Sequence, residues 1–125
     1  MGTLKTTLKV ESTDLFPTPV SFTNVNNNQV NGNFSGFNTI APGTAGANIN
    51  VAAIDASAYV YAQAPTTNTD IVQILDGAGA QVCTLVPGDT VFFHYLGDTG
   101  TGLTDLTAIA LNLTDKINSF VGERS

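Results

Sequence analysis

The sequence predicts a single soluble all-β domain, an antiparallel β-sandwich or jelly roll of about seven to nine short strands. Three observations lead to this prediction. Apolar and polar residues alternate with a period of two, helical periodicity is nearly absent, and Gly, Pro and Asn cluster between the alternating segments. The length, 125 residues, is usual for one domain. We therefore expect one core enclosed between two sheets.

The first predicted strand covers Leu4–Val10, where every second residue from Leu4 onward shares one face. After the prolines at 17 and 19, a second strand begins at Val20. Residues 24–50 are predicted to form a long ordered loop, because Asn and Gly are frequent there, with one short strand near Val30–Phe34. Loops of this length in a compact domain usually carry function or form interfaces.

Further strands are predicted over Ile49–Ile54, Ser57–Gln63, Ile71–Leu75, Ala80–Val86, Val91–Leu96 and Leu103–Leu113. Asp76-Gly77 is predicted to turn the chain between the strands Ile71–Leu75 and Ala80–Val86, since Asp-Gly suits a type I′ hairpin. Ala78-Gly79 can lengthen this loop. Pro87-Gly88-Asp89 predicts a second tight turn, with Pro fixing φ and Gly following it. The strand Val91–Leu96 is apolar on both faces, which is typical of a sandwich interior or an interface.

The domain is expected to span residues 1–113, followed by a C-terminal tail over 114–125. The apolar residues Phe120 and Val121 lie three and four residues after Ile117, which is the spacing of the apolar side of a helix. The spacing predicts a short helix there. An arm that docks on another subunit is the alternative.

Charge excludes two classes of partner. Only 11% of residues are charged and the net charge is −6, with four bases that do not cluster. Nucleic acids and anionic membrane surfaces require clustered Lys or Arg, so we expect neither as a partner. The first residues lack the pattern of a signal peptide, and no apolar stretch approaches the ~18 residues of a membrane span. The low charge indicates a surface covered by neighbours.

The sequence shows no catalytic set, and we predict that the chain is not an enzyme and binds no cofactor or metal. Cys83 lies in an apolar run, as a small buried hydrophobe would, and His94 lacks a neighbouring His or Cys that could complete a metal site. A Cys83–His94 dyad across the Pro87 turn is the alternative for these two residues. The segment from Asp98 to Gly102 has one acid where calcium loops have several.

In its low charge and its Thr-, Asn- and Gly-rich turns between strands, the chain resembles small accessory virion proteins of tailed bacteriophages, of the head decoration or cement type. The opening strand Leu4–Val10 and the hairpin from Asp76 to Asp89 carry the resemblance. It implies a virion location after assembly in host cytoplasm. It also implies binding to major capsid protein or another virion protein, as a homo-oligomer, with a trimer favoured.

We therefore expect a structural protein that stabilises a particle through many copies of one modest contact. Phe34, Phe37, Tyr59 and Tyr61 are the candidate contact residues, because aromatic residues are enriched at interface hot spots. A carbohydrate- or receptor-binding module of a phage tail or fibre is the alternative. A small enzyme ranks third, because the chain has few ionisable groups.

Overall fold

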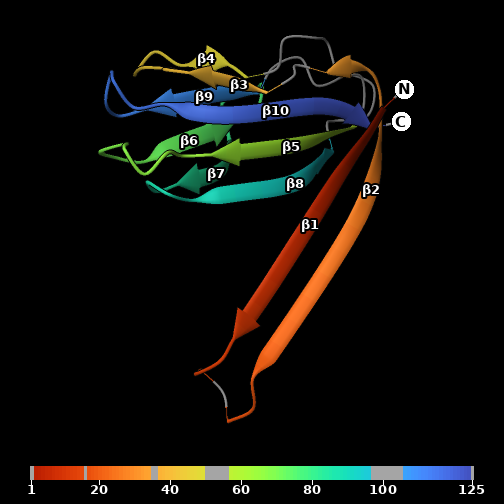
Figure 1. Cartoon of the computed structure of the whole chain (residues 1–125). Coiled ribbons are helices and arrows are strands. Elements are labelled where there is room, and N and C mark those ends of the chain that lie inside the picture. Colours follow the sequence, from red (N-terminus) through yellow and green to blue (C-terminus); the bar gives the residue numbers. More distant parts are fainter. Residues whose placement is uncertain (1, 16, 35–36, 50–56, 97–105, 125) are drawn as a thin grey trace.

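The computed structural model describes residues 2–15, 17–34, 37–49, 57–96 and 106–124, and it confirms the all-β prediction. A six-stranded sheet has the order β1-β2-β10-β5-β8, with β3 also pairing β10, and a four-stranded sheet has the order β4-β9-β6-β7. All pairings in the described residues are antiparallel. In Figure 1 the two sheets lie face to face, and β1 and β2 project away from them as a hairpin.

The strands of the six-stranded sheet are β1 (Gly2–Ser12), β2 (Val20–Phe34), β3 (Asn38–Ile40), β5 (Ser57–Gln63), β8 (Thr90–Leu96) and β10 (Ile117–Arg124). Those of the four-stranded sheet are β4 (Ala47–Asn48), β6 (Val72–Leu75), β7 (Gln81–Leu85) and β9 (Thr107–Ala110). The predicted strand Ile49–Ile54 and the first part of Leu103–Leu113 lie mostly outside the described residues.

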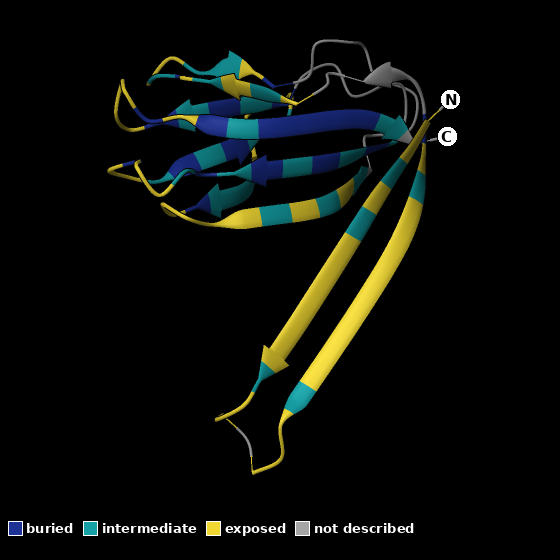
Figure 2. Cartoon of the chain, in the orientation of Figure 1, coloured by how far each residue is buried: buried dark blue, intermediate teal, exposed yellow. Residues whose placement is uncertain are grey.

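The core lies between the sheets, and strict alternation builds it. In β5 the residues Ala58, Val60 and Ala62 are fully buried, while the intervening Tyr59 and Tyr61 point to the other side. Side chains from the opposing sheet complete the core: Val72, Ile74, Leu85, Ala108 and Ala110. Figure 2 shows the same alternation as bands of dark blue and teal along the strands. The prediction for 57–63 is thus confirmed in its bounds and in its two faces.

The two predicted turns differ in their outcome. Gly88 has φ 95°, and the Asp89 amide donates to the Val86 carbonyl at 2.9 Å, which confirms the tight turn after Pro87. The β6–β7 hairpin also forms, but its positive φ (86°) falls on Gly79 and not on Gly77. The Asp76 carboxylate accepts from the Ala78 and Ala80 amides and fixes this longer loop, so the type I′ assignment to Asp-Gly was wrong.

The predicted loop over residues 24–50 was wrong for its first part, because β2 continues unbroken from Val20 to Phe34. Its Asn-rich segment pairs with β1 throughout. The side chain of Asn28 donates to the Leu4 carbonyl and to the Thr6 hydroxyl, both at 3.1 Å. These bonds across the pair stabilise a strand whose composition is otherwise unfavourable.

The predicted C-terminal tail or helix over 114–125 was also wrong, because β10 is a central strand of the six-stranded sheet. One side of β10 pairs with β5, and the other pairs first with β3 and then with β2. Ile117 and Val121 enter the core, whereas Phe120 points to the outer side. Both faces of β10 are covered, so its apolar residues do not alternate as in a half-exposed strand.

A buried carboxylate joins two loops at the end of the sandwich remote from the hairpin. Asp115, 1% exposed, accepts hydrogen bonds from the amides of Thr69 and Asp70, both at 2.9 Å. Beside it, Asn68 donates to the Lys116 carbonyl at 2.7 Å and accepts from the Lys116 amide at 2.8 Å. These hydrogen bonds hold the two residues that directly precede β10 in place.

Candidate interaction surface

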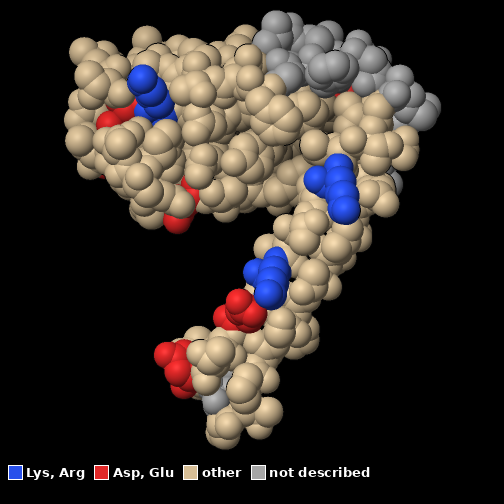
Figure 3. All heavy atoms as spheres, in the orientation of Figure 1, with Lys and Arg blue, Asp and Glu red and all other residues tan. Residues whose placement is uncertain are grey.

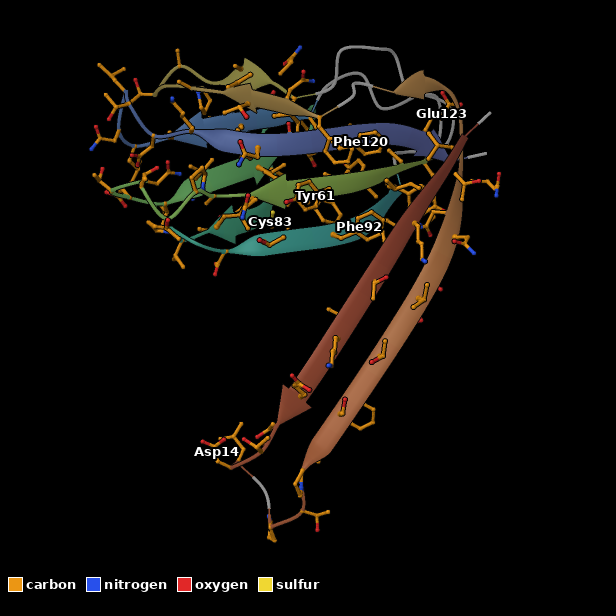
Figure 4. All side chains as sticks on the ribbon, in the orientation of Figure 1. Asp14, Tyr61, Cys83, Phe92, Phe120 and Glu123 are labelled. Atoms are coloured by element: carbon orange, nitrogen blue, oxygen red, sulfur yellow. The ribbon has the colours of Figure 1, made fainter. Side chains whose placement is uncertain are left out.

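The outer side of the six-stranded sheet carries a row of aromatic side chains. In the sheet register Tyr61 stands opposite Phe120 of β10 on one side and Phe92 of β8 on the other. Tyr59 stands opposite His94. Directly paired residues share a face, so these five side chains all lie on the side away from the core. Figure 4 shows Phe120, Tyr61 and Phe92 next to one another on three adjacent strands.

The rings contact each other as pairs. The ring centroids of Tyr59 and Phe92 are 5.9 Å apart with an interplanar angle of 12°, and those of Tyr59 and His94 are 5.3 Å apart. Phe37, which precedes β3, lies 4.9 Å from Phe120 and 6.1 Å from Tyr61. We call these six residues the aromatic face. Such ring pairs add stability beyond the area that they bury.

The aromatic face is accessible even though its rings contact one another. Phe37 is 70% exposed and Phe92 38% exposed, whereas Phe120 below Phe37 is only 7% exposed. Phe37 therefore covers Phe120 and offers its own outer side to a partner. Exposed aromatic clusters of this kind are typical of interaction sites.

Of the predicted contact residues, the structure brings together Phe37, Tyr59 and Tyr61. Phe34 is the last residue of β2 and pairs with Gly122 through the backbone, and its side chain lies outside the described part. The sequence analysis missed Phe92, His94 and Phe120 as members of the site. The two apolar faces of β8 were the signal that could have identified Phe92.

The projecting hairpin has an apolar face of its own. The register pairs Val10 with Phe22 and Leu8 with Asn24, so Leu4, Leu8, Val10, Val20 and Phe22 share one side. We call these five residues the hairpin face. Lys5 and Lys9 occupy the opposite side of β1. Leu8 is 65% exposed, Val10 55% and Phe22 68%, so the hairpin face is largely uncovered.

The hairpin face and the aromatic face look toward a common groove of about 560 Å³. Leu4, Thr6 and Leu8 line it from the hairpin, and Phe37, Tyr61 and Phe92 line it from the sheet. Lys5 is the only charged residue of this lining. In Figure 3 the surface between the hairpin and the sheets is mostly tan, with one blue side chain where the hairpin meets the sheets. The groove is thus suited to contact with a neutral, apolar surface.

Gly122 allows the sheet and the base of the hairpin to approach closely. A Cβ at this position would lie 2.8 Å from Val30 Cγ1 and 2.9 Å from Phe120 Cε1. Val30, 5% exposed, is the innermost hairpin residue and pairs with both Gly2 and Arg124. The ring of Phe120 therefore rests over the glycine and against the hairpin base.

The structure separates the two residues of the alternative dyad. Cys83 is in the four-stranded sheet and packs against the core, whereas His94 lies on the aromatic face of the other sheet. His94 is exposed, and its ring lies tilted against that of Tyr59 at an interplanar angle of 30°. No groups of acids, His or Cys suited to a metal ion occur among the described residues. Asp98 to Gly102 lies outside them.

Burial raises the pKa of the Cys83 thiol. The thiolate is the reactive form, so the folded protein has less of it at a given pH than the unfolded chain. We expect Cys83 to react with a disulfide reagent at pH 8 several-fold more slowly in the folded protein than in urea. Cys83→Ser gives the background rate. Equal rates in both states would contradict the half-buried placement.

Comparison with protein-family models, with curated proteins and with solved structures gives no match to this chain. In the described part of the chain, no helix has the length and apolar character needed to cross a membrane. The functional argument therefore rests on the hairpin face, the aromatic face and the groove between them.

Proposed function

We propose that this chain is a non-enzymatic structural protein of a virion. It decorates the capsid by binding major capsid protein, or another virion protein, through the hairpin face and the aromatic face. The observation that carries the proposal is the projecting hairpin, whose apolar side stays exposed beside a second exposed apolar surface. Monomers rarely leave such neighbouring apolar patches uncovered.

The reach of the hairpin supports this role. Eleven residue pairs join β1 to β2, from Gly2–Val30 to Ser12–Val20. At ~3.4 Å per residue, ten steps extend the hairpin by about 34 Å, roughly the diameter of a small domain. An isolated two-stranded hairpin is marginally stable in water. A hairpin of this length is therefore suited to lie along a neighbouring subunit, and many copies on one particle add their modest contacts.

Particles purified from the virus that encodes the chain test the proposal. Quantitative mass spectrometry is expected to find the chain in a fixed ratio to major capsid protein. Phe22→Asp, which places a charge on the hairpin face, is expected to be lost from the particles, whereas Thr23→Asp on the opposite side is retained. Absence of the unaltered chain from purified particles would contradict the proposal.

A carbohydrate-binding module is the second candidate, favoured by one observation. Tyr59 and Phe92 stack nearly parallel, and Phe92 is 38% exposed, so that aromatic surface on which a sugar ring can stack is accessible. A glycan array probed with the chain and with Tyr59→Ala tests it. A glycan bound by the first and not by the second would favour this candidate, and an array without binding would remove it.

A further inference from the structure

We propose that the groove receives the hairpin of a second copy of this chain. Each copy gives its hairpin face to the aromatic face of a neighbour and receives a hairpin in return. The inference rests on the proposed function in that it names an occupant for the same surface. It adds that the capsid-binding unit is an oligomer held together by exchanged hairpins.

The chain cannot cover these surfaces by itself. The hairpin is fixed at its base, where β2 pairs with β10 at Phe34–Gly122 and Val30–Arg124. From there it leaves the sheet at an angle, so that Asp14 near its far end lies remote from Tyr61 and Phe92 (Figure 4). Phe22 stays 68% exposed as a result, and the groove stays open. The occupant must therefore come from another molecule.

A second copy matches the groove in chemistry. The aromatic face carries no acid or base apart from His94, and the hairpin face is aliphatic and aromatic. The asparagines that share the hairpin side, such as Asn24 and Asn26, are neutral hydrogen-bonding groups. Residues 35–125 hold all but four of the chain's charged side chains, and their net charge of −6 makes direct contact between two sandwiches unfavourable. The hairpin (residues 2–34) is neutral overall, because the two positive charges of Lys5 and Lys9 balance the two negative charges of Glu11 and Asp14.

The backbone supplies a second reason. β1 and β8 are the two outermost strands of their sheet. Among the described residues, the part of β2 before Val30 pairs only with β1. Long open edges of this kind favour pairing with another chain unless they are covered. A second copy brings another chain to these edges, whereas a monomer leaves them open.

The area is sufficient for a specific assembly. A two-stranded ribbon about 34 Å long and about 10 Å wide covers roughly 340 Å² of a partner. A copy that gives one hairpin and receives one therefore buries about twice that footprint. A typical stable interface buries about 800 Å² on each partner. The exchange approaches this value, whereas a single one-sided contact does not.

Light scattering of the full chain during size-exclusion chromatography tests the inference, at concentrations up to about 100 µM. We expect a defined oligomer, whose mass gives the number of copies. Phe22→Asp is expected to lower the association constant at least about 30-fold, as a hot-spot aromatic does. Thr23→Asp is the matched control, with the same charge at the adjacent position on the opposite side of the hairpin, and it is expected to leave the oligomer intact.

Both variants keep the fold, because Phe22 and Thr23 are exposed, and unchanged circular dichroism verifies this. A photo-crosslinker at position 22, in a mixture of isotopically light and heavy chains, is expected to join β2 of one copy to β5 or β8 of another. A monomeric chain, or an oligomer that Phe22→Asp does not weaken, would overturn the inference. If the chain is monomeric but still requires Phe22 to enter particles, the exchange fails and the proposed function stands.

Discussion

Asp115→Ala is expected to lower the free energy of unfolding by about 3 kcal/mol, the upper range for a single buried polar group. The carboxylate accepts from the amides of Thr69 and Asp70 and from the Thr69 hydroxyl, all within 3.2 Å. Alanine removes the acceptor from three donors that lie in a part-buried site, although Thr69 and Asp70 are themselves exposed residues. The cost of an unsatisfied buried donor exceeds the small net gain of the bond itself.

Urea unfolding monitored by circular dichroism measures the effect as a lower midpoint with an unchanged slope. Asp14→Ala is the matched control, because Asp14 is exposed and, within the described part of the chain, accepts one long bond, 3.5 Å from the Ser12 hydroxyl. We expect the control to change the stability by less than about 0.5 kcal/mol. A loss below about 1 kcal/mol for Asp115→Ala would show that the two loops are not held through this carboxylate.

Gly122→Ala is expected to destabilise the protein by about 2 kcal/mol, within the range for overpacking a well-packed site. The added methyl would meet Val30 Cγ1 at 2.8 Å and the Phe120 ring at 2.9–3.0 Å. Both neighbours are buried, so the methyl must displace the ring or the base of the hairpin. Gly122→Ala is therefore expected to change both the free energy of unfolding and the arrangement of the side chains around the groove.

Thermal unfolding measures the stability, and the near-ultraviolet circular dichroism of the aromatic face reports the displaced ring. Gly2→Ala is the matched control, because a Cβ at Gly2 meets nothing within 4 Å and the residue pairs with the same Val30. Alanine within a strand loses less backbone entropy than glycine, so the control is expected to be neutral or slightly stabilising. Equal effects of both substitutions would contradict the close approach at Gly122.

The sequence predicted correctly those features that depend on residues close in sequence. The alternation in Ser57–Gln63, with one face of the strand buried, and the Pro87-Gly88 turn are two examples. β10 lacks such a pattern, because Phe120 is covered by Phe37 on one side while Ile117 and Val121 enter the core on the other. Its three apolar residues at helix-like spacing therefore predicted the wrong element.

The hairpin could not be predicted for a different reason. Asparagine is unfavourable in strands, and the bonds of Asn28 to Leu4 and Thr6 span 24 and 22 residues. Composition alone does not reveal such partners. The same applies to the aromatic face, whose rings come from four separate segments. Tyr59 and Tyr61 were identifiable as residues of one strand face, but their proximity to Phe37, Phe92 and Phe120 depends on the pairing of β5 with β8 and β10.

The central position of β10 also determines the order in which the protein acquires its structure. β2, β3 and β5 all precede β10 in the chain, and each needs it as a hydrogen-bonding neighbour. Pairing between strands far apart in sequence is slow, whereas a hairpin of adjacent strands forms within microseconds. On the ribosome the β1–β2 hairpin can therefore form as soon as it emerges, while the sandwich waits for residues 117–124. In a nascent chain the strands of the hairpin can therefore pair before β10 completes the six-stranded sheet.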